Sequence, residues 1–408
     1  MKLRNRLLMF MILTAMLGLT LFACLTLIDR NSEKQPDEST VIPADNKIPA
    51  SFKGSVSDEY GVPAEVMKTI TDYMDAYYRS IYTLEEAELK DLFAEEKMAA
   101  VSEKAIGLLV STRKIYDFDF SMNKAHYDLK VTDYKEEGGK YHVDLLEDDY
   151  FSFRFLNGIE SSAYDIENSF IIDKDLKITD LNKVQGYYLT FYENDESMDK
   201  LNETYDYYLR QMKDLIAYNT EVLIPRAQKE AYFTDKRVKD TYDREAAVAY
   251  SYQYYHDRNP EWYEFSDEGG NCQNYASQAM LSGGIRMDHE GEEQWKCYVE
   301  DPDYEPYIND EETPEGRTQS WVNVGYFYNY ARDNIGKGLV ADVNVDISYA
   351  QPGDIIIVGN GGLSHTVIVS KVVDGHILVN SNSIDMKDFP IEAYTYTNVL
   401  LIKILGCN

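Results

Sequence analysis

Basic charge is scarce in this chain. Its 408 residues hold 40 lysines and arginines against 71 aspartates and glutamates, which gives a formal net charge of −31. Such a surface repels phosphate backbones and anionic lipid headgroups, so it argues against nucleic-acid binding and against docking on a membrane through a basic patch. We therefore expect no nucleic-acid partner. We expect the folded part of the protein to function in the presence of cations or polycationic polymers.

Cysteine is also rare, and the usual metal and nucleotide motifs are missing. The four cysteines are Cys24, Cys272, Cys297 and Cys407, with no CxxC or HxxxH pair, so no zinc module is predicted. The chain has no Walker loop, no dinucleotide-binding fingerprint and no Gly-x-Ser-x-Gly elbow. We expect no metal and no organic cofactor. A disulfide between Cys297 and Cys407 is left open.

A long uncharged run stands at the N-terminus. Leu7 to Ile28 contain no charged residue and follow Lys2, Arg4 and Arg6. At about 1.5 Å per residue such a helix spans a bilayer core of about 30 Å, and the preceding basic residues keep the start in the cytoplasm. One interpretation is an uncleaved anchor, another is a lipoprotein signal cleaved before Cys24, and a cleaved secreted form is the third. The first two predict an extracytoplasmic protein held at the cell membrane, as an anchor or as a lipoprotein.

The rest of the chain divides into four predicted segments. Residues 29–56 are polar, contain three prolines and read as a flexible stalk. Residues 57–193 form an N-terminal α+β domain, residues 194–237 a helical connector, and residues 238–408 a second domain. Residues 1–28 are the anchor or signal.

The N-terminal domain is predicted from two helical patterns followed by alternating strands. Residues 63–82 carry an apolar stripe, and Thr83 with Glu86 resembles a capping box that opens a second helix. Strands then flank the turns at Gly138-Gly139 and at 173–175. This order suggests a cystatin- or NTF2-type half-barrel, which we interpret as a spacer or recognition domain.

Cys272 is the first candidate for chemistry. It follows Gly269-Gly270 and opens the stretch "CQNYASQAMLS", which is predicted to be a helix of about eleven residues closed by Gly283-Gly284. Unpaired N–H groups and the dipole at a helix start stabilise an anion, so a thiol there is expected to have a lowered pKa and to act as a nucleophile. The alternative is a packed, inert cysteine.

His365 is the candidate base for that thiol. It opens the stretch "HTVIVSKVV", which Asp374-Gly375 joins to "HILVNSNS" as a predicted hairpin. If Val373 faces His376, then His365 faces Ile384, with Asn382 as its diagonal neighbour on the same face.

Asn382, or Asn380 one pair further along, is then the candidate orienting residue. A carboxamide there could accept the imidazole N–H and fix its tautomer, as cysteine hydrolases require. Among the other histidines, His376 is expected to be exposed in the hairpin turn, and His256 to lie near a helix end.

These segments carry a family resemblance. The stretches "YDREAAVAYSYQYY", "GGNCQNYASQAMLSGG", "SWVNVGYFYNYA", "PGDIIIV" and "SHTVIVSKV", in that order over roughly residues 238–405, resemble the putative amidase domain of Gram-positive bacteria. That family is similar to the CHAP and NlpC/P60 groups of papain-like cysteine amidases and peptidases. The resemblance implies an NlpC/P60-like, papain-like α+β fold for residues 238–408, Cys272 as nucleophile, His365 as base, and a polar residue on the next strand as the third member.

Two positions depart from the pattern of that family. The residue before the cysteine is usually Asp and here is Asn271, and Asn382-Ser383 stands where a His-Thr pair is expected. We therefore carry two hypotheses. The first is a membrane-tethered extracytoplasmic cysteine hydrolase that cuts cell-wall peptide amides or another amide substrate through Cys272, His365 and Asn382. The alternative is a non-catalytic binding or scaffold module of the cell envelope on the same fold.

Overall fold

The computed structural model shows a mixed α+β protein built on one large sheet. It describes residues 52–183, 197–223, 235–266, 269–290, 294–297, 317–359, 362–394 and 398–408. The predicted anchor or lipoprotein signal, with Cys24, and most of the predicted stalk lie outside these residues. Within the described ranges no helix combines the length and the apolar character needed to cross a bilayer.

In the described residues, the N-terminal half consists of two α-helices, one short 3-10 helix and five strands. These are β1 (Phe52–Ser57), α2 (Ala64–Thr83), η1 (Lys90–Leu92), α3 (Glu96–Arg113), β2 (Met122–Glu137), β3 (Lys140–Phe153), β4 (Ser161–Ile172) and β5 (Ile178–Lys183). The predicted hairpin at Gly138-Gly139 is confirmed, since Glu137 pairs with Lys140 and both glycines have positive φ. The two further strands are confirmed as β4 and β5, which pair with each other.

The predicted capping box is wrong. Thr83 ends α2 instead of opening α3, and its hydroxyl donates to the carbonyl of Arg79 one turn earlier. The helix runs this far because its apolar stripe continues to Ile81 and Tyr82, both buried, and the Tyr82 hydroxyl reaches the carbonyl of Asn123. Leu84 then takes a left-handed conformation and closes the helix.

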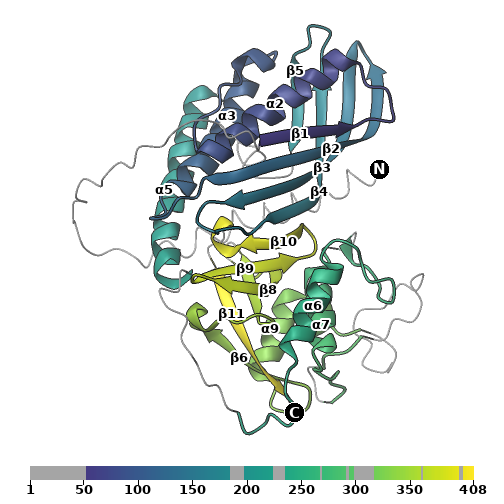
Figure 1. Cartoon of the computed structure of the whole chain (residues 1–408), viewed down its shortest axis with the longest axis vertical. Coiled ribbons are helices and arrows are strands. Elements are labelled where there is room, and N and C mark those ends of the chain that lie inside the picture. The colour runs from purple at the N-terminus through teal and green to yellow at the C-terminus, as the bar shows by residue number, and fades with distance from the viewer. Residues whose placement is uncertain are drawn as a thin grey trace, which may run out of the picture.

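A single long helix links the two halves. This helix, α5 (Met198–Leu223), lies within the range predicted to be a helical connector and has Leu201, Met212 and Ile216 on its buried side. It packs against α3 of the N-terminal half and against the short helix η3 (Ile347–Tyr349) of the C-terminal half. In Figure 1 it runs along the side of the molecule past both parts.

The elements of the C-terminal half are α6 (Arg244–Tyr254), α7 (Cys272–Ser282), α8 (Gln319–Val322), α9 (Val324–Asp333), β6 (Leu339–Val345), β7 (Ile355–Gly359), β8 (His365–Val373), β9 (His376–Ser381), β10 (Asp385–Pro390), η4 (Ile391–Ala393) and β11 (Asn398–Cys407). In this half, α6, α7 and α9 lie together on one side of the strands (Figure 1). The α7 boundaries are those predicted. Cys297 and Cys407 are not joined to each other, so the disulfide left open above is absent.

The sheet continues from one half into the other. Its strand order is β1-β2-β3-β4-β10-β9-β8-β7-β11-β6, with β5 on β4. The junction is the antiparallel pair β4–β10, in which Ser162, Ala163 and Tyr164 face Lys387, Met386 and Asp385. β4 therefore carries β10 at one end and β5 at the other (Figure 1). Strands of the N-terminal half directly support the hairpins that hold the candidate site.

A β-bulge in the β8–β9 hairpin changes the predicted register. The turn at Asp374-Gly375 is confirmed and Val373 faces His376, but the register shifts between Val369 and Lys371. Beyond the bulge Ile368 pairs with Asn380, which the sequence-based register had paired with Val369. The extra residue is Ser370 of β8. Because strand side chains alternate between faces, this one-residue shift reverses which side chains of β8 and β9 share a face beyond the bulge.

His376 is not exposed, contrary to the prediction. Its side chain is 12% exposed, and its Nδ1 lies 2.7 Å from Oε1 of the buried Glu392. Its ring packs against Phe118 and Phe155 of the N-terminal half, at centroid distances of 5.1 and 4.7 Å. These partners lie more than 200 positions away in the chain, so the hairpin sequence alone could not reveal them.

Candidate functional site

Cys272 is the first residue of α7 and lies inside the C-terminal core. It is 7% exposed and belongs to an apolar cluster with Phe327 of α9, Ile357 of β7 and Ile368 of β8. The helix packs on the sheet through small and aromatic side chains such as Ala276 and Tyr275. The predicted position at a helix start is therefore correct, and the thiol is nearly enclosed.

Burial dominates the acidity of this thiol. Loss of solvent raises the pKa of Cys272 above its ordinary value, while the backbone N–H groups of Thr366 and Gln273 and the hydroxyl of Ser383 lower it in part. The predicted lowering of the thiol pKa by the helix start is therefore wrong in direction. A charged thiolate is costly in this apolar setting. In the free protein the thiol is protonated at neutral pH.

A buried hydrogen bond ties the start of α7 to the start of β8. The Thr366 hydroxyl donates to Oε1 of Gln273 over 2.8 Å, and Nε2 of Gln273 reaches the Ser277 hydroxyl at 3.2 Å. Both Thr366 and Gln273 are fully buried. The strand that begins with His365 is thereby fixed beside the helix that begins with Cys272, and the Thr366 N–H faces the sulfur.

His365 occupies the first position of β8 and is partly buried. Its strand partner is Val358 of β7, and its ring centroid lies 6.3 Å from that of Tyr394. Val358 and Tyr394 belong to the core shared with the N-terminal half, whereas Cys272 belongs to the core around α7. Within the described residues no hydrogen bond joins His365 to Cys272.

Burial also keeps the imidazole of His365 neutral. It lowers the pKa from 6.5 to about 4, because the charged form is poorly solvated there. A neutral imidazole retains a lone pair on one ring nitrogen and can accept a proton. The site therefore holds a protonated thiol and an unprotonated imidazole on adjoining segments.

The two candidate orienting residues contact other groups. The Asn382 amide donates to the carbonyls of Tyr254 and Tyr255 at the end of α6, over 3.0 and 3.2 Å. Asn380 donates to the Ser251 hydroxyl and accepts from the backbone N–H of Asp388. The bulge accounts for this, because it turns Asn380 and the positions after it away from the face of His365. Among the described residues neither asparagine bonds to that histidine.

Asn271 and Asn382, both at positions that depart from the expected family pattern, are hydrogen-bonded to each other. The Asn271 amide donates to Oδ1 of Asn382 over 2.8 Å, while its own oxygen accepts from the N–H of Phe265 and from the Asn274 amide. Asn274 in turn accepts from the indole N–H of Trp321. This buried network of neutral amides holds the residue before Cys272 in place and brings no charge to the thiol.

Sequence reasoning missed Ser383. Its hydroxyl accepts from the backbone N–H of Asn271 over 2.7 Å and faces the sulfur of Cys272. The residue has φ of 134°, a left-handed value that only glycine adopts readily. The sequence marks this position only as part of the Asn382-Ser383 departure, and its contact with the thiol could not be foreseen because it depends on the turn between β9 and β10.

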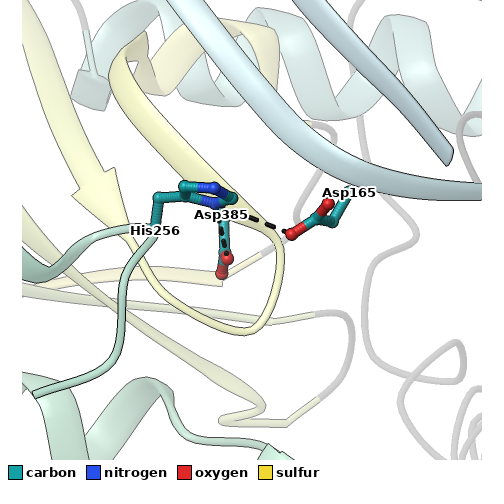
Figure 2. Close-up of side chains that lie close together, drawn as sticks. All are labelled: Asp165, His256 and Asp385. Atoms are coloured by element: carbon teal, nitrogen blue, oxygen red, sulfur yellow. Dashed lines mark ion pairs between the residues drawn. The ribbon is translucent and has the colours of Figure 1, made fainter. Parts of the chain in front are cut away.

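A histidine and two aspartates, residue types that can ligate a metal ion, cluster at the junction of the two halves. His256, which follows α6, points between Asp165 of β4 and Asp385 of β10, as Figure 2 shows. Nδ1 of His256 lies 3.7 Å from Asp165 Oδ2 and 3.5 Å from Asp385 Oδ2. Arg258 already donates to Asp385 Oδ2 over 2.7 Å and supplies positive charge. We interpret the cluster as a structural contact around the Arg258–Asp385 ion pair, at the place where β4 meets β10.

Comparison with known proteins agrees with one part of the chain. Residues 241–404 match a family described as a putative amidase domain. This range includes Cys272, His365, Asn382 and Ser383, and it points to a hydrolase that acts on carbon–nitrogen bonds. No curated protein and no solved structure matched the chain.

Proposed function

We propose that this protein is a cysteine amidase or peptidase that is tethered outside the cell membrane and cuts peptide amides of the cell wall. The observation that carries the proposal is the position of the Cys272 thiol at the first residue of α7. There it lies beside the backbone N–H of Thr366, the residue that follows His365, inside the segment that matches an amidase family. The N-terminal run of apolar residues supports the tether.

The proposed reaction starts from neutral partners. As the sulfur of Cys272 attacks the substrate carbonyl, the imidazole of His365 takes the thiol proton, and the backbone N–H groups at the start of α7 stabilise the oxyanion. His365 returns the proton to the departing amine, which leaves a thioester on Cys272. Water then adds to the thioester, and the acid is released with the thiol restored.

This reaction requires His365 to approach the sulfur. Its ring now lies toward Tyr394, so a change of side-chain rotamer on substrate binding is part of the proposal. Catalytic hydrogen bonds are often long or unformed in a free enzyme and tighten in the complex with substrate. The role of Asn382 is proposed as support for the segment before Cys272 instead of orientation of the imidazole.

The pH dependence of the free enzyme follows from His365. With a pKa of about 4, the imidazole is a competent base above about pH 5, and kcat/KM is expected to fall only below that value. His365→Gln should lower kcat/KM by about 10² to 10⁴-fold and remove this acid limb. Amide hydrolysis of purified cell wall, followed by release of free amines from pH 4 to pH 8, provides the measurement.

The same shift affects stability in a known direction. Because the folded-state pKa lies below 6.5, the unfolded chain binds the His365 proton first, so stability is lost as the pH falls from about 6.5 toward 4. Circular dichroism at each assay pH separates unfolding from loss of the base. An acid limb near pH 6.5 in folded protein would contradict the assignment of His365 in this environment.

The alternative function, a non-catalytic binding or scaffold module, is favoured by the enclosed thiol. Cys272 is buried and protonated, and the neutral pair Asn271–Asn382 adds no charge that would activate it. Binding to cell-wall peptides without amine release, undiminished in Cys272→Ala, would support this reading. The hydrolase predicts amine release that depends on Cys272.

A further inference from the structure

We propose that Ser383 is the residue that positions the Cys272 thiol, accepting a hydrogen bond from the N–H of Asn271 and donating one to the sulfur. The assignment rests on the proposed function, since it explains how a buried thiol could be readied for attack. It does not depend on which amide is cut.

The contacts of Ser383 specify the direction of its hydroxyl. The N–H of Asn271 donates to its oxygen over 2.7 Å, so that lone pair is engaged and the hydroxyl proton is free to point elsewhere. Cys272 directly follows Asn271, and the Ser383 hydroxyl is one of the groups whose hydrogen bonding lowers the pKa of its thiol. One hydroxyl thereby links the residue before the cysteine to the cysteine itself.

The backbone of this turn is held in a costly conformation. Ser383 has φ of 134°, and a Cβ built on the facing Gly270 would lie 3.2 Å from its hydroxyl oxygen. Strained backbone of this kind persists where surrounding contacts fix it, and it clusters at functional sites. The contacts that fix it here include the Ser383 N–H with Asp385 Oδ1 and the ion pair of Asp385 with Arg258.

Ser383 is also far more accessible to solvent than the thiol. The residue is exposed, whereas Cys272 is 7% exposed. A substrate that reaches the sulfur from solvent would meet this turn. A hydroxyl at that point can keep its hydrogen bond to the sulfur when the thiol loses its proton. The bond is then stronger, because the thiolate acceptor is charged, and it stabilises the thiolate.

The test compares two variants that lack the hydroxyl and differ in backbone strain. Ser383→Ala keeps the unfavourable φ, while Ser383→Gly relieves it. If the hydroxyl acts on the thiol, both variants should shift the pH midpoint of Cys272 alkylation upward. The iodoacetamide rate below that midpoint should fall about tenfold, a factor consistent with loss of one hydrogen bond to a charged group.

A matched control lies in the same turn. The Ser381 hydroxyl donates to the carbonyl of Ile384 over 2.7 Å, so its proton is engaged within the turn. Ser381→Ala is expected to lower stability and to leave the alkylation midpoint unchanged. Mass spectrometry of the full chain separates alkylation at Cys272 from that at the other cysteines.

Three outcomes in the variants would overturn the assignment, and one in the wild type. They are an unchanged midpoint in both Ser383 variants, a shift in Ser383→Ala that Ser383→Gly abolishes, and an equal shift in Ser381→Ala. A wild-type Cys272 that stays unreactive at every pH where the protein is folded would overturn it as well. None of these readouts uses hydrolysis, so they are distinct from a failure of Cys272 or His365 as catalytic residues.

Discussion

Cys272→Ala is expected to abolish amide release while leaving the protein folded. If the sulfur forms the covalent intermediate, its removal leaves only binding and oxyanion stabilisation, and kcat should fall by at least about a thousandfold. The residue is small, so truncation removes a single sulfur atom from the core. Release of amines from purified cell wall by wild type and variant gives the comparison.

A second buried thiol provides the control. Cys297 is 2% exposed and packs in the same apolar cluster as Cys272. Cys297→Ala makes the same deletion in the same core and should retain hydrolysis, with at most a modest loss of stability. Equal amine release by Cys272→Ala and wild type would contradict the cysteine hydrolase and would favour the non-catalytic binding module.

Lys183→Met is expected to cause the largest loss of stability of any single change proposed for this chain. Lys183 is 1% exposed, and its Nζ lies 2.5 Å from Oε2 of the fully buried Glu147. Removal of one partner of a buried ion pair leaves an uncompensated charge, which costs about 3–5 kcal/mol. The midpoint of guanidinium unfolding measures the change.

The surroundings of Glu147 make that charge hard to accommodate. Tyr78 donates within a short contact to Glu147 and lies equally near Asp149, and Asn168 donates to Glu147 over 2.7 Å. Burial, followed by repulsion from Glu147, raises the pKa of Asp149 well above its ordinary value, so this carboxyl is protonated. Lys183 is therefore the cation that balances Glu147 in this cluster.

An exposed pair and a double variant complete the experiment. Lys68 and Asp72 form a pair of similar length, 2.6 Å, on the surface of α2. Lys68→Met should cost less than about 1 kcal/mol, as exposed pairs do. Adding Glu147→Gln to Lys183→Met should restore much of the loss. A Lys183→Met protein as stable as Lys68→Met would contradict the role given to this cluster.

Local sequence signals predicted the position of a helix or a hairpin well where a single turn fixes its end. Asp374-Gly375 specified its hairpin because two successive positive φ values suit few other residues. The α7 helix was placed correctly because Gly283 and Gly284 end its apolar pattern. Such features depend on neighbours within a few positions.

The candidate site depended on longer-range contacts. The bulge near Ser370 is not encoded in the hairpin turn, and Ser370 instead bonds to Asp388 across the sheet. That shift altered the partners of Asn380 and Asn382, which the sequence had assigned to His365. The pKa of Cys272 was misjudged for the same reason, since its burial comes from α9 and β7 and not from its own helix.

The pairing of β4 with β10 affects how the protein could be cut into pieces. A fragment limited to the matched residues 241–404 would leave the outer edge of β10 without its hydrogen-bonded neighbour, and an open strand edge invites aggregation. The fragment would also lack the end of β11, including Cys407, which pairs with Leu339 of β6. The matched range is a unit of sequence, whereas an expression experiment should begin before β1 and retain the C-terminus.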